Sequence, residues 1–128
     1  MTDIFIRMVL GHLVGDYLLQ SESMGIKKGY LHIYCLIHCL IYTLTVCLFM
    51  WNFHPLIMVL VFLSHYPIDK WSLGLLWLRL INGRDYWKEF NNKKDEYRDL
   101  KLPFSCFVYV AADNTIHIVL LWLISLLV

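Results

Sequence analysis

Long apolar runs limit this chain to folds in which whole helices are surrounded by lipid or by other apolar helices. Of its 128 residues, 59% are hydrophobic and only 16% are charged, against roughly half and a quarter in an ordinary soluble domain. A helix needs about twenty apolar residues to cross a bilayer. Four stretches come close to that length, at about residues 4–19, 31–51, 56–70 and 104–127. We therefore predict an all-α, polytopic membrane four-helix bundle that forms a single domain.

The charged residues are concentrated in one connecting segment, about residues 71–102, of which residues 82–102 hold eleven of the twenty-one charged side chains. The first part of the segment is apolar, with Trp71 and Trp77, which suits the headgroup region of a membrane. Either the third helix leaves the membrane near Lys70, or a separate interfacial helix begins there. Four residues of the charged part are spaced as on one helix face: Trp87, Phe90, Tyr97 and Leu100. We expect an additional interfacial, amphipathic helical segment between the third and fourth membrane helices.

The basic residues predict the orientation of the bundle. Lys27 and Lys28 lie between the first two apolar stretches, and residues 82–102, between the third and fourth, hold six basic residues. The connection at residues 52–55 has none. Because cytoplasmic loops are enriched in lysine and arginine, we place both basic connections in the cytoplasm and both termini outside. Nothing in this pattern predicts a nucleic-acid partner.

Three aspartates interrupt the otherwise apolar helices. A carboxylate within a membrane helix is costly and marks a functional site by default. Each of the three has a histidine four residues away: His12 with Asp16, His65 with Asp69, and His117 with Asp113. Residues i and i+4 lie on one helix face, so both side chains of a pair can bind the same cation. For one such pair alone, a hydrogen bond that neutralises a buried carboxylate is the better explanation.

His38 in the second stretch adds a seventh candidate, and at 1.5 Å per residue all four helices can present these groups at one depth. Three pairs and His38 together favour a metal site over simple pairing. The predicted ligands are His12, Asp16, His38, His65, Asp69, Asp113 and His117. Nitrogen and oxygen ligands suit zinc best, with manganese or iron as alternatives. Seven ligands exceed the four of one tetrahedral ion, so we expect one or two divalent cations, with one aspartate bridging if there are two.

Three polar residues at the cytoplasmic ends of these helices are candidates for binding an anionic substrate: Gln20, Lys28 and Lys70. The alternative for the lysines is that they extend towards the lipid headgroups. The tyrosines and tryptophans are interpreted as mostly lipid-facing or interfacial.

The order of these motifs resembles a known family. The chain has His12-Leu-Val-Gly-Asp16-Tyr-Leu-Leu-Gln20, then Lys27 or Lys28, His38, His65-x3-Asp69 and Asp113-Asn-x-x-His117. This series is similar to that of the domain-of-unknown-function 3307 family of small bacterial and phage membrane proteins, whose pattern often has glutamine in place of Asn114. The resemblance implies a helical membrane protein, of the bacterial inner membrane, but no activity. A weaker likeness to membrane-bound metal-dependent hydrolases implies a reaction class.

These features predict a metal-dependent, membrane-embedded hydrolase for a phosphoester or other ester of a lipid or lipid-linked substrate. Asp16, Asp69 and Asp113 are the catalytic candidates, and water activated by the metal is the expected nucleophile. The alternative is a divalent metal-ion transporter or sensor that uses the same His/Asp pairs, and so small a transporter would need to form a homodimer. A third hypothesis is that the metal only stabilises the bundle.

Overall fold

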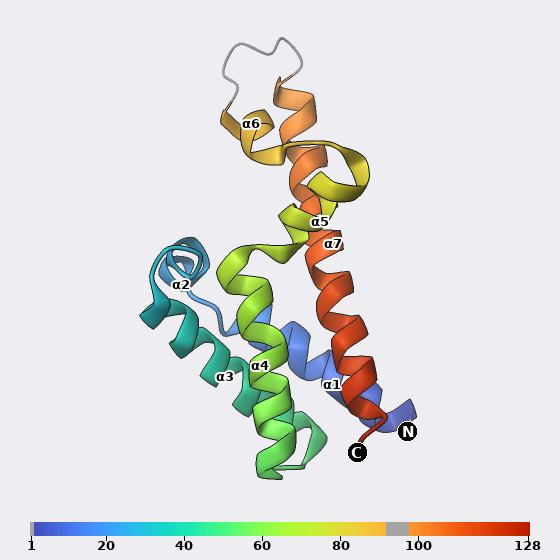
Figure 1. The fold of residues 1–128 in the computed structure, drawn as a ribbon. Helices are drawn as coiled ribbons and strands as arrows, with labels where there is room; N and C mark the ends of the chain where they lie inside the picture. Colours follow the sequence, from blue (N-terminus) through green and yellow to red (C-terminus); the bar gives the residue numbers. More distant parts are fainter. Residues whose placement is uncertain (1, 92–97) are drawn as a thin grey trace.

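The chain folds into helices only, throughout the part that the computed structural model describes, residues 2–91 and 98–128 (Figure 1). In chain order the elements are α1 (Thr2–Leu13), the π-helix η1 (Val14–Leu18), α2 (Glu22–Lys27), α3 (His32–Met50), α4 (Pro55–Trp71), α5 (Leu73–Asn82), α6 (Tyr86–Asn91) and α7 (Arg98–Ser125). The predicted all-α class is confirmed. Tyr97 and the rest of residues 92–97 in the predicted amphipathic segment lie outside the described residues.

Two helices are long and apolar enough to cross a membrane, judged by length and composition alone: α3 and residues Lys101–Ser125 of α7. The predicted bundle has four such helices, and α1 and α4 are shorter than this criterion requires. Two of the four predicted membrane helices, those at about residues 31–51 and 104–127, therefore meet the criterion.

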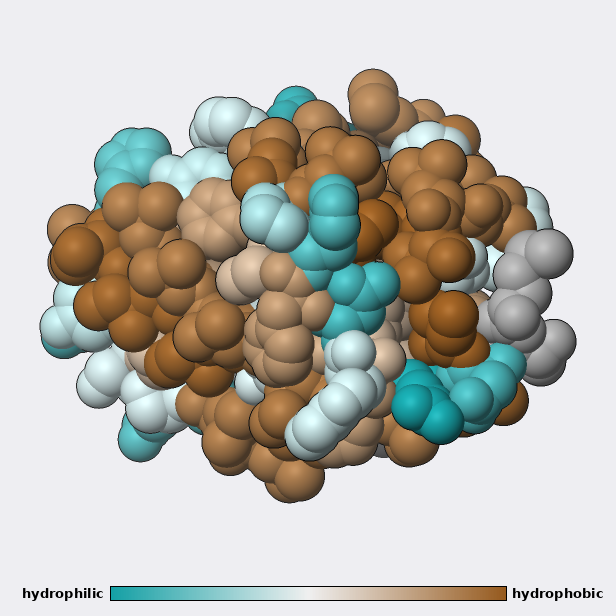
Figure 2. All heavy atoms as spheres, turned by 90° about the horizontal axis from the view of Figure 1, so that it is seen from below, coloured by the Kyte–Doolittle hydropathy of each residue, from teal (hydrophilic) through white to brown (hydrophobic). Residues whose placement is uncertain are grey.

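Four helices form a ring around a common interior. Helix α3 packs against α1 and α4, and α7 closes the ring by packing against α4 and α1. Both termini and the α3–α4 turn lie at one end, whereas α2 and the start of α5 lie towards the other (Figure 1). Seen from the end of the termini, apolar residues cover most of the visible surface, with hydrophilic residues in smaller groups among them (Figure 2). The described parts of both basic connections, at α2 and around α6, lie away from the end that carries the termini (Figure 1).

The interior between the termini and the middle of the bundle is a compact apolar core, centred on Met8, Tyr42, Val46, Cys47, Met50, Ile57, Val61, Leu121 and Ile124. Helices α1 and α3 approach closely there because two glycines four residues apart face α3. A Cβ atom on Gly11 would lie 2.8 Å from the Cα of Val46, and one on Gly15 would lie 3.0 Å from the Tyr42 ring. Small residues at this spacing are typical of close helix packing in membranes.

The predicted and observed helices differ at two boundaries near the site. The first apolar stretch changes from α-helix to π-helix at Val14, and a short helix, α2, follows it. The third stretch ends at Ser72, whose left-handed backbone (φ 49°) stops α4 and allows α5 to begin as a separate helix. A separate helix therefore begins just after Lys70, and one long helix does not continue through it.

The start of the last helix also differs from the prediction. The helix expected from about residue 104 begins at Arg98, and Pro103 lies inside it. A proline so close to a helix start removes only one backbone hydrogen bond, so the helix continues through it.

Candidate metal site

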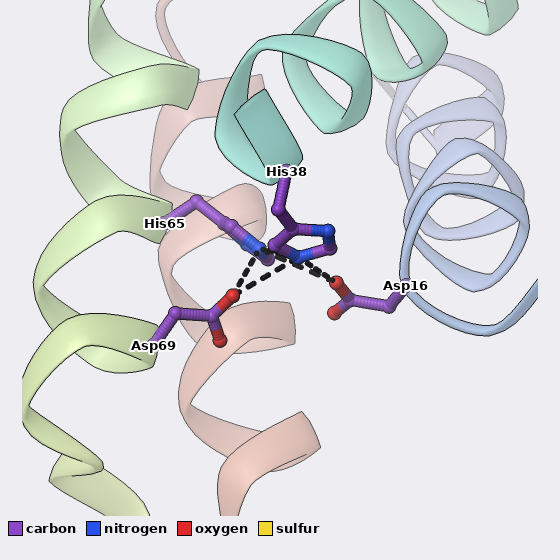
Figure 3. Close-up of side chains that lie close together, drawn as sticks. All are labelled: Asp16, His38, His65 and Asp69. Carbon is purple, nitrogen blue, oxygen red and sulfur yellow. Dashed lines mark hydrogen bonds and ion pairs between the residues drawn. The ribbon is translucent and has the colours of Figure 1, made fainter. Parts of the chain in front are cut away.

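Polar side chains from every helix of the ring meet in the half of the interior nearest α2 and α5. Asp16 from η1, His38 from α3, and His65 and Asp69 from α4 point towards one another (Figure 3). The structure brings all seven predicted ligands into three overlapping groups, each with ligand atoms within 4.8 Å of one another: Asp16, His38, His65 and Asp69; His12, Asp16 and His117; Asp69, Asp113 and His117. We call the first the four-residue group and the third the His117 group.

The four-residue group is tightly packed around two imidazole nitrogens. His38 Nε2 lies 3.0 Å from Asp16 Oδ1, 3.0 Å from Asp69 Oδ2 and 3.0 Å from His65 Nε2. His65 Nε2 lies 3.1 Å from Asp69 Oδ2 and 3.3 Å from Asp16 Oδ1. With metal–ligand distances of about 2.0–2.1 Å, neighbouring ligand atoms lie about 2.9 Å apart at a right angle and about 3.4 Å apart in a tetrahedron. The observed spacings fall in this range, so the group has the dimensions that a divalent cation requires.

Asp16 lies in the middle of the π-helix η1 and faces two groups at once. Its Oδ1 points at the four-residue group, while its Oδ2 lies 3.2 Å from His12 Nδ1. A π-helix adds about one residue to a helical turn and is frequently found at functional sites. Here the Asp16 carboxylate reaches His12 on α1 and His38 on α3.

The ring of His12 is held by two residues that were not among the predicted site residues, Tyr42 and Asn114. His12 Nε2 lies 2.9 Å from Asn114 Oδ1, and His12 Nδ1 lies 3.2 Å from the Tyr42 hydroxyl. Asn114 Nδ2 donates to the Val110 carbonyl oxygen and to the Tyr17 hydroxyl, so the amide oxygen is the atom left to accept from His12. This assignment leaves Nδ1 without a hydrogen and directed at Asp16, as in histidines that bind metals with one nitrogen and donate from the other.

Tyr42 departs from the interpretation of the tyrosines as lipid-facing, because it is 1% exposed and its ring stacks on that of His65, with 3.6 Å between centroids. A signal for it existed in the sequence, since Tyr42 follows His38 by four residues and therefore lies on the same helix face. Asn114 could have been noticed as the polar neighbour of Asp113 in an apolar helix.

Of the three predicted substrate-binding residues, Lys28 and Gln20 lie beside the groups and Lys70 does not. Lys28 Nζ donates to Asp69 Oδ2 at 2.8 Å. Burial alone lowers the pKa of Lys28, but the adjacent Asp69 carboxylate outweighs this effect and the pKa is raised above its ordinary value. Lys70 Nζ instead donates to the Gly29 carbonyl oxygen at 3.3 Å. The structure thus gives Lys70 the role of tying α4 to the end of α2.

Two cavities adjoin the groups on the side of α2. One, of about 200 Å³, is bordered by Asp16, Gln20, Lys28, Asp113 and other residues, and the second, of about 340 Å³, by Lys28, Asp69 and others. Lys28, Gly25 and Tyr109 border both cavities. The cavities therefore give the carboxylates a polar approach from the end of the bundle that carries α2.

Comparisons with known proteins give one family. The chain matches no curated protein and no solved structure. The sequence model of the family described as Protein of unknown function (DUF3307) matches residues 4–128, which includes every motif quoted above. The chain therefore belongs to the DUF3307 family.

Proposed function

We propose that this protein is a multi-pass membrane hydrolase that uses a divalent cation, with zinc as the best fit to the ligands, to cleave a phosphoester or other ester of a lipid or lipid-linked substrate. The observation that carries the proposal is the crowding of polar atoms in the four-residue group. His38 Nε2 has three polar atoms at 3.0 Å, and a ring nitrogen has at most one hydrogen to donate.

Hydrogen bonding alone accounts poorly for that crowding. His65 Nε2 has the same neighbours as His38 Nε2, so hydrogens on both nitrogens would point into the same small space. If only one nitrogen carries a hydrogen, the lone pair of the other faces two carboxylate oxygens. A cation among the four ligand atoms satisfies all of them and compensates for burying the two carboxylates.

A membrane location is supported by the outer face of α3. Leu36, Leu40, Leu44 and Leu48 are spaced four residues apart and are 39–55% exposed. A continuous apolar stripe of this kind is expected to face lipid rather than water. We propose that α1 with η1, α3, α4 and α7 all cross the membrane, with both termini outside and the α2 end cytoplasmic, in keeping with the basic residues there.

The surroundings of the groups favour a hydrolase over a metal-ion transporter. The two cavities described above reach the carboxylates from the α2 end, whereas the apolar core lies on the other side of the histidines. Met8 is one turn from His12, and Val61 is one turn from His65, both towards the termini and both 0% exposed. An ion that enters from the α2 end therefore meets buried apolar side chains beyond His12 and His65, although one-sided binding is also compatible with a sensor.

The proposed reaction adds water across the ester. The oxygen of water forms a bond to phosphorus or to the acyl carbon, the bond to the alcohol oxygen breaks, one water proton is taken up by a carboxylate, and the departing alcohol oxygen gains a proton. A bound divalent cation supplies Lewis acidity and lowers the pKa of water. Asp16 and Asp113 border the smaller cavity and are placed to accept the proton, and the cationic Lys28 is placed to bind an anionic substrate oxygen.

The test starts with untagged protein purified in detergent. Metal content by mass spectrometry and hydrolysis of a panel of lipid phosphoesters, including phosphatidic acid and isoprenyl phosphates, are measured for the wild type and for His65→Ala. His54→Ala is the matched control, because His54 is an exposed histidine in the α3–α4 turn. We expect His65→Ala to lose both metal and activity, and His54→Ala to keep both. Folded wild-type protein without metal contradicts the proposal, and metal flux into proteoliposomes without hydrolysis supports the transporter instead.

A further inference from the structure

We infer that a second divalent cation binds to the His117 group and shares Asp69 with the first. The ligands are Asp69 Oδ1, Asp113 Oδ2 and His117 Nε2. The inference rests on the proposed function only for the cation of the four-residue group.

The first observation is the environment of His117. Its side chain is 3% exposed, and its Nε2 makes no hydrogen bond within the described residues. The nearest acidic oxygens, Asp69 Oδ1 and Asp113 Oδ2, each lie 3.6 Å away. That distance is too long for a hydrogen bond but close to the spacing of about 3.4 Å between ligands of one tetrahedral ion. A buried ring nitrogen between two carboxylate oxygens, bonded to neither, is arranged as a ligand.

The second observation is the way in which Asp69 divides its oxygens. Oδ2 faces the four-residue group, at 3.0 Å from His38 Nε2 and 3.1 Å from His65 Nε2. Oδ1 faces His117. A carboxylate with one oxygen directed to each group is the usual bridge between two cations about 3.5–4 Å apart. The structure therefore assigns the bridging role to Asp69.

Charge balance supports the same conclusion. The three carboxylates of the two groups contribute three negative charges and Lys28 contributes one positive charge, if the histidines are neutral. One divalent cation makes the site neutral, and a neutral site has little attraction for an anionic substrate. Two divalent cations make it doubly positive, which matches a phosphomonoester dianion and favours a phosphate over an uncharged ester.

Helix α5 holds Asp113 in the required orientation. A Cβ atom on Gly74 would lie 3.1 Å from Asp113 Oδ1 and 3.2 Å from the Asp113 Cα. The missing side chain lets α7 lie directly against α5, so that Oδ1 is covered and Oδ2 faces His117. Gly74 is thus a positioning residue for the second cation, since the three atoms nearest to its missing side chain all belong to Asp113.

The experiment counts the cations. Untagged protein is loaded with Zn²⁺ or Mn²⁺, freed of excess metal and analysed by mass spectrometry, with circular dichroism and size exclusion to verify the fold. We expect two ions in the wild type, one in His117→Ala and in Asp113→Asn, and two in the controls His54→Ala and Asp3→Asn. Gly74→Ala should lower the affinity for the second ion at least several-fold. Mn²⁺-loaded wild type should give an exchange-coupled electron paramagnetic resonance spectrum that His117→Ala converts to that of an isolated ion.

The outcomes separate this inference from the proposed function. One ion in the wild type that is kept in His117→Ala and lost in His65→Ala overturns the second site and leaves the hydrolase proposal standing. Two ions that persist in both His117→Ala and Asp113→Asn also overturn the second site. No ion in folded wild-type protein overturns both.

Discussion

The two halves of the bundle interior use the same helix faces with opposite chemistry. One turn separates a polar residue of the site from an apolar residue of the core on three helices: His12 from Met8, His65 from Val61, and His117 from Leu121. All six side chains are at most 3% exposed. Burial is therefore the same in both halves, and only the side chains differ.

This comparison separates the sources of stability from those of function. Burying an apolar side chain stabilises the fold by about 1.5–3 kcal/mol, whereas burying polar groups costs free energy unless they are paired or bind a cation. The apolar half therefore holds the helices together. The polar half, with its three carboxylates and four histidines, is expected to weaken the metal-free protein, and its presence indicates a functional requirement.

The largest effect is expected for Asp69→Asn, which alters the carboxylate shared by both groups. We expect loss of all tightly bound metal, because a neutral amide is a poor ligand for a divalent cation. The rate of hydrolysis should fall about a hundredfold or more, equivalent to about 2.7 kcal/mol. Metal analysis and the lipid phosphoester assay measure it, with Asp3→Asn as the control on the same charge change. Undiminished metal in Asp69→Asn would contradict the assignment of function to the polar half.

Leu121→Ala tests the other half and should do the reverse. Truncating a buried leucine destabilises a protein by about 2–5 kcal/mol, and Leu121 is 1% exposed. The free energy of unfolding in detergent should fall by that amount, while the metal content stays that of the wild type. Leu44→Ala, on the exposed stripe of α3, is the matched control with a change within about 0.5 kcal/mol. Equal effects of the two variants would mean that the apolar half does not provide the stability.

Chelation sharpens the comparison without changing the chain. A cation present at about one hundred times its dissociation constant stabilises the folded state by about 2.7 kcal/mol. Dialysis against a chelator should therefore lower the unfolding temperature of the wild type and of Leu121→Ala alike. The Asp69→Asn protein should not respond, since it has no cation to lose. A chelator effect that persists in Asp69→Asn points to metal bound elsewhere.

The smallest expected effect belongs to Asn114→Ala, which removes the partner of His12 but no predicted ligand. Groups that orient a metal ligand typically contribute a factor of about 10–100 to metal affinity. Competition with a chromogenic chelator measures that loss, and metal should still bind at saturating concentration. Thr115→Ala is the control, because the Thr115 hydroxyl is exposed and donates only to the Ala111 carbonyl oxygen. Wild-type affinity in Asn114→Ala would show that His12 needs no such support.

The sequence located the polar half of the interior because its evidence is local. A carboxylate and a histidine four residues apart share a helix face whatever the rest of the fold, and apolar surroundings make such a pair conspicuous. Residues without that pattern gave no comparable signal. Tyr42 looked like any tyrosine of an apolar helix, and Lys70 looked equivalent to Lys28 although its ammonium group turns to Gly29.

Composition and spacing by themselves determined that this protein is helical, that it has candidate membrane helices, and which seven residues belong together. Tertiary structure decided how they are grouped, because distances between helices depend on packing over the whole chain. The close approach of α1 to α3 at Gly11 and Gly15, and the π-helix around Asp16, bring the Asp16 carboxylate to both His12 and His38. The division of Asp69 between two groups follows from the packing of α4 against both α3 and α7 and has no signature in the order of the residues.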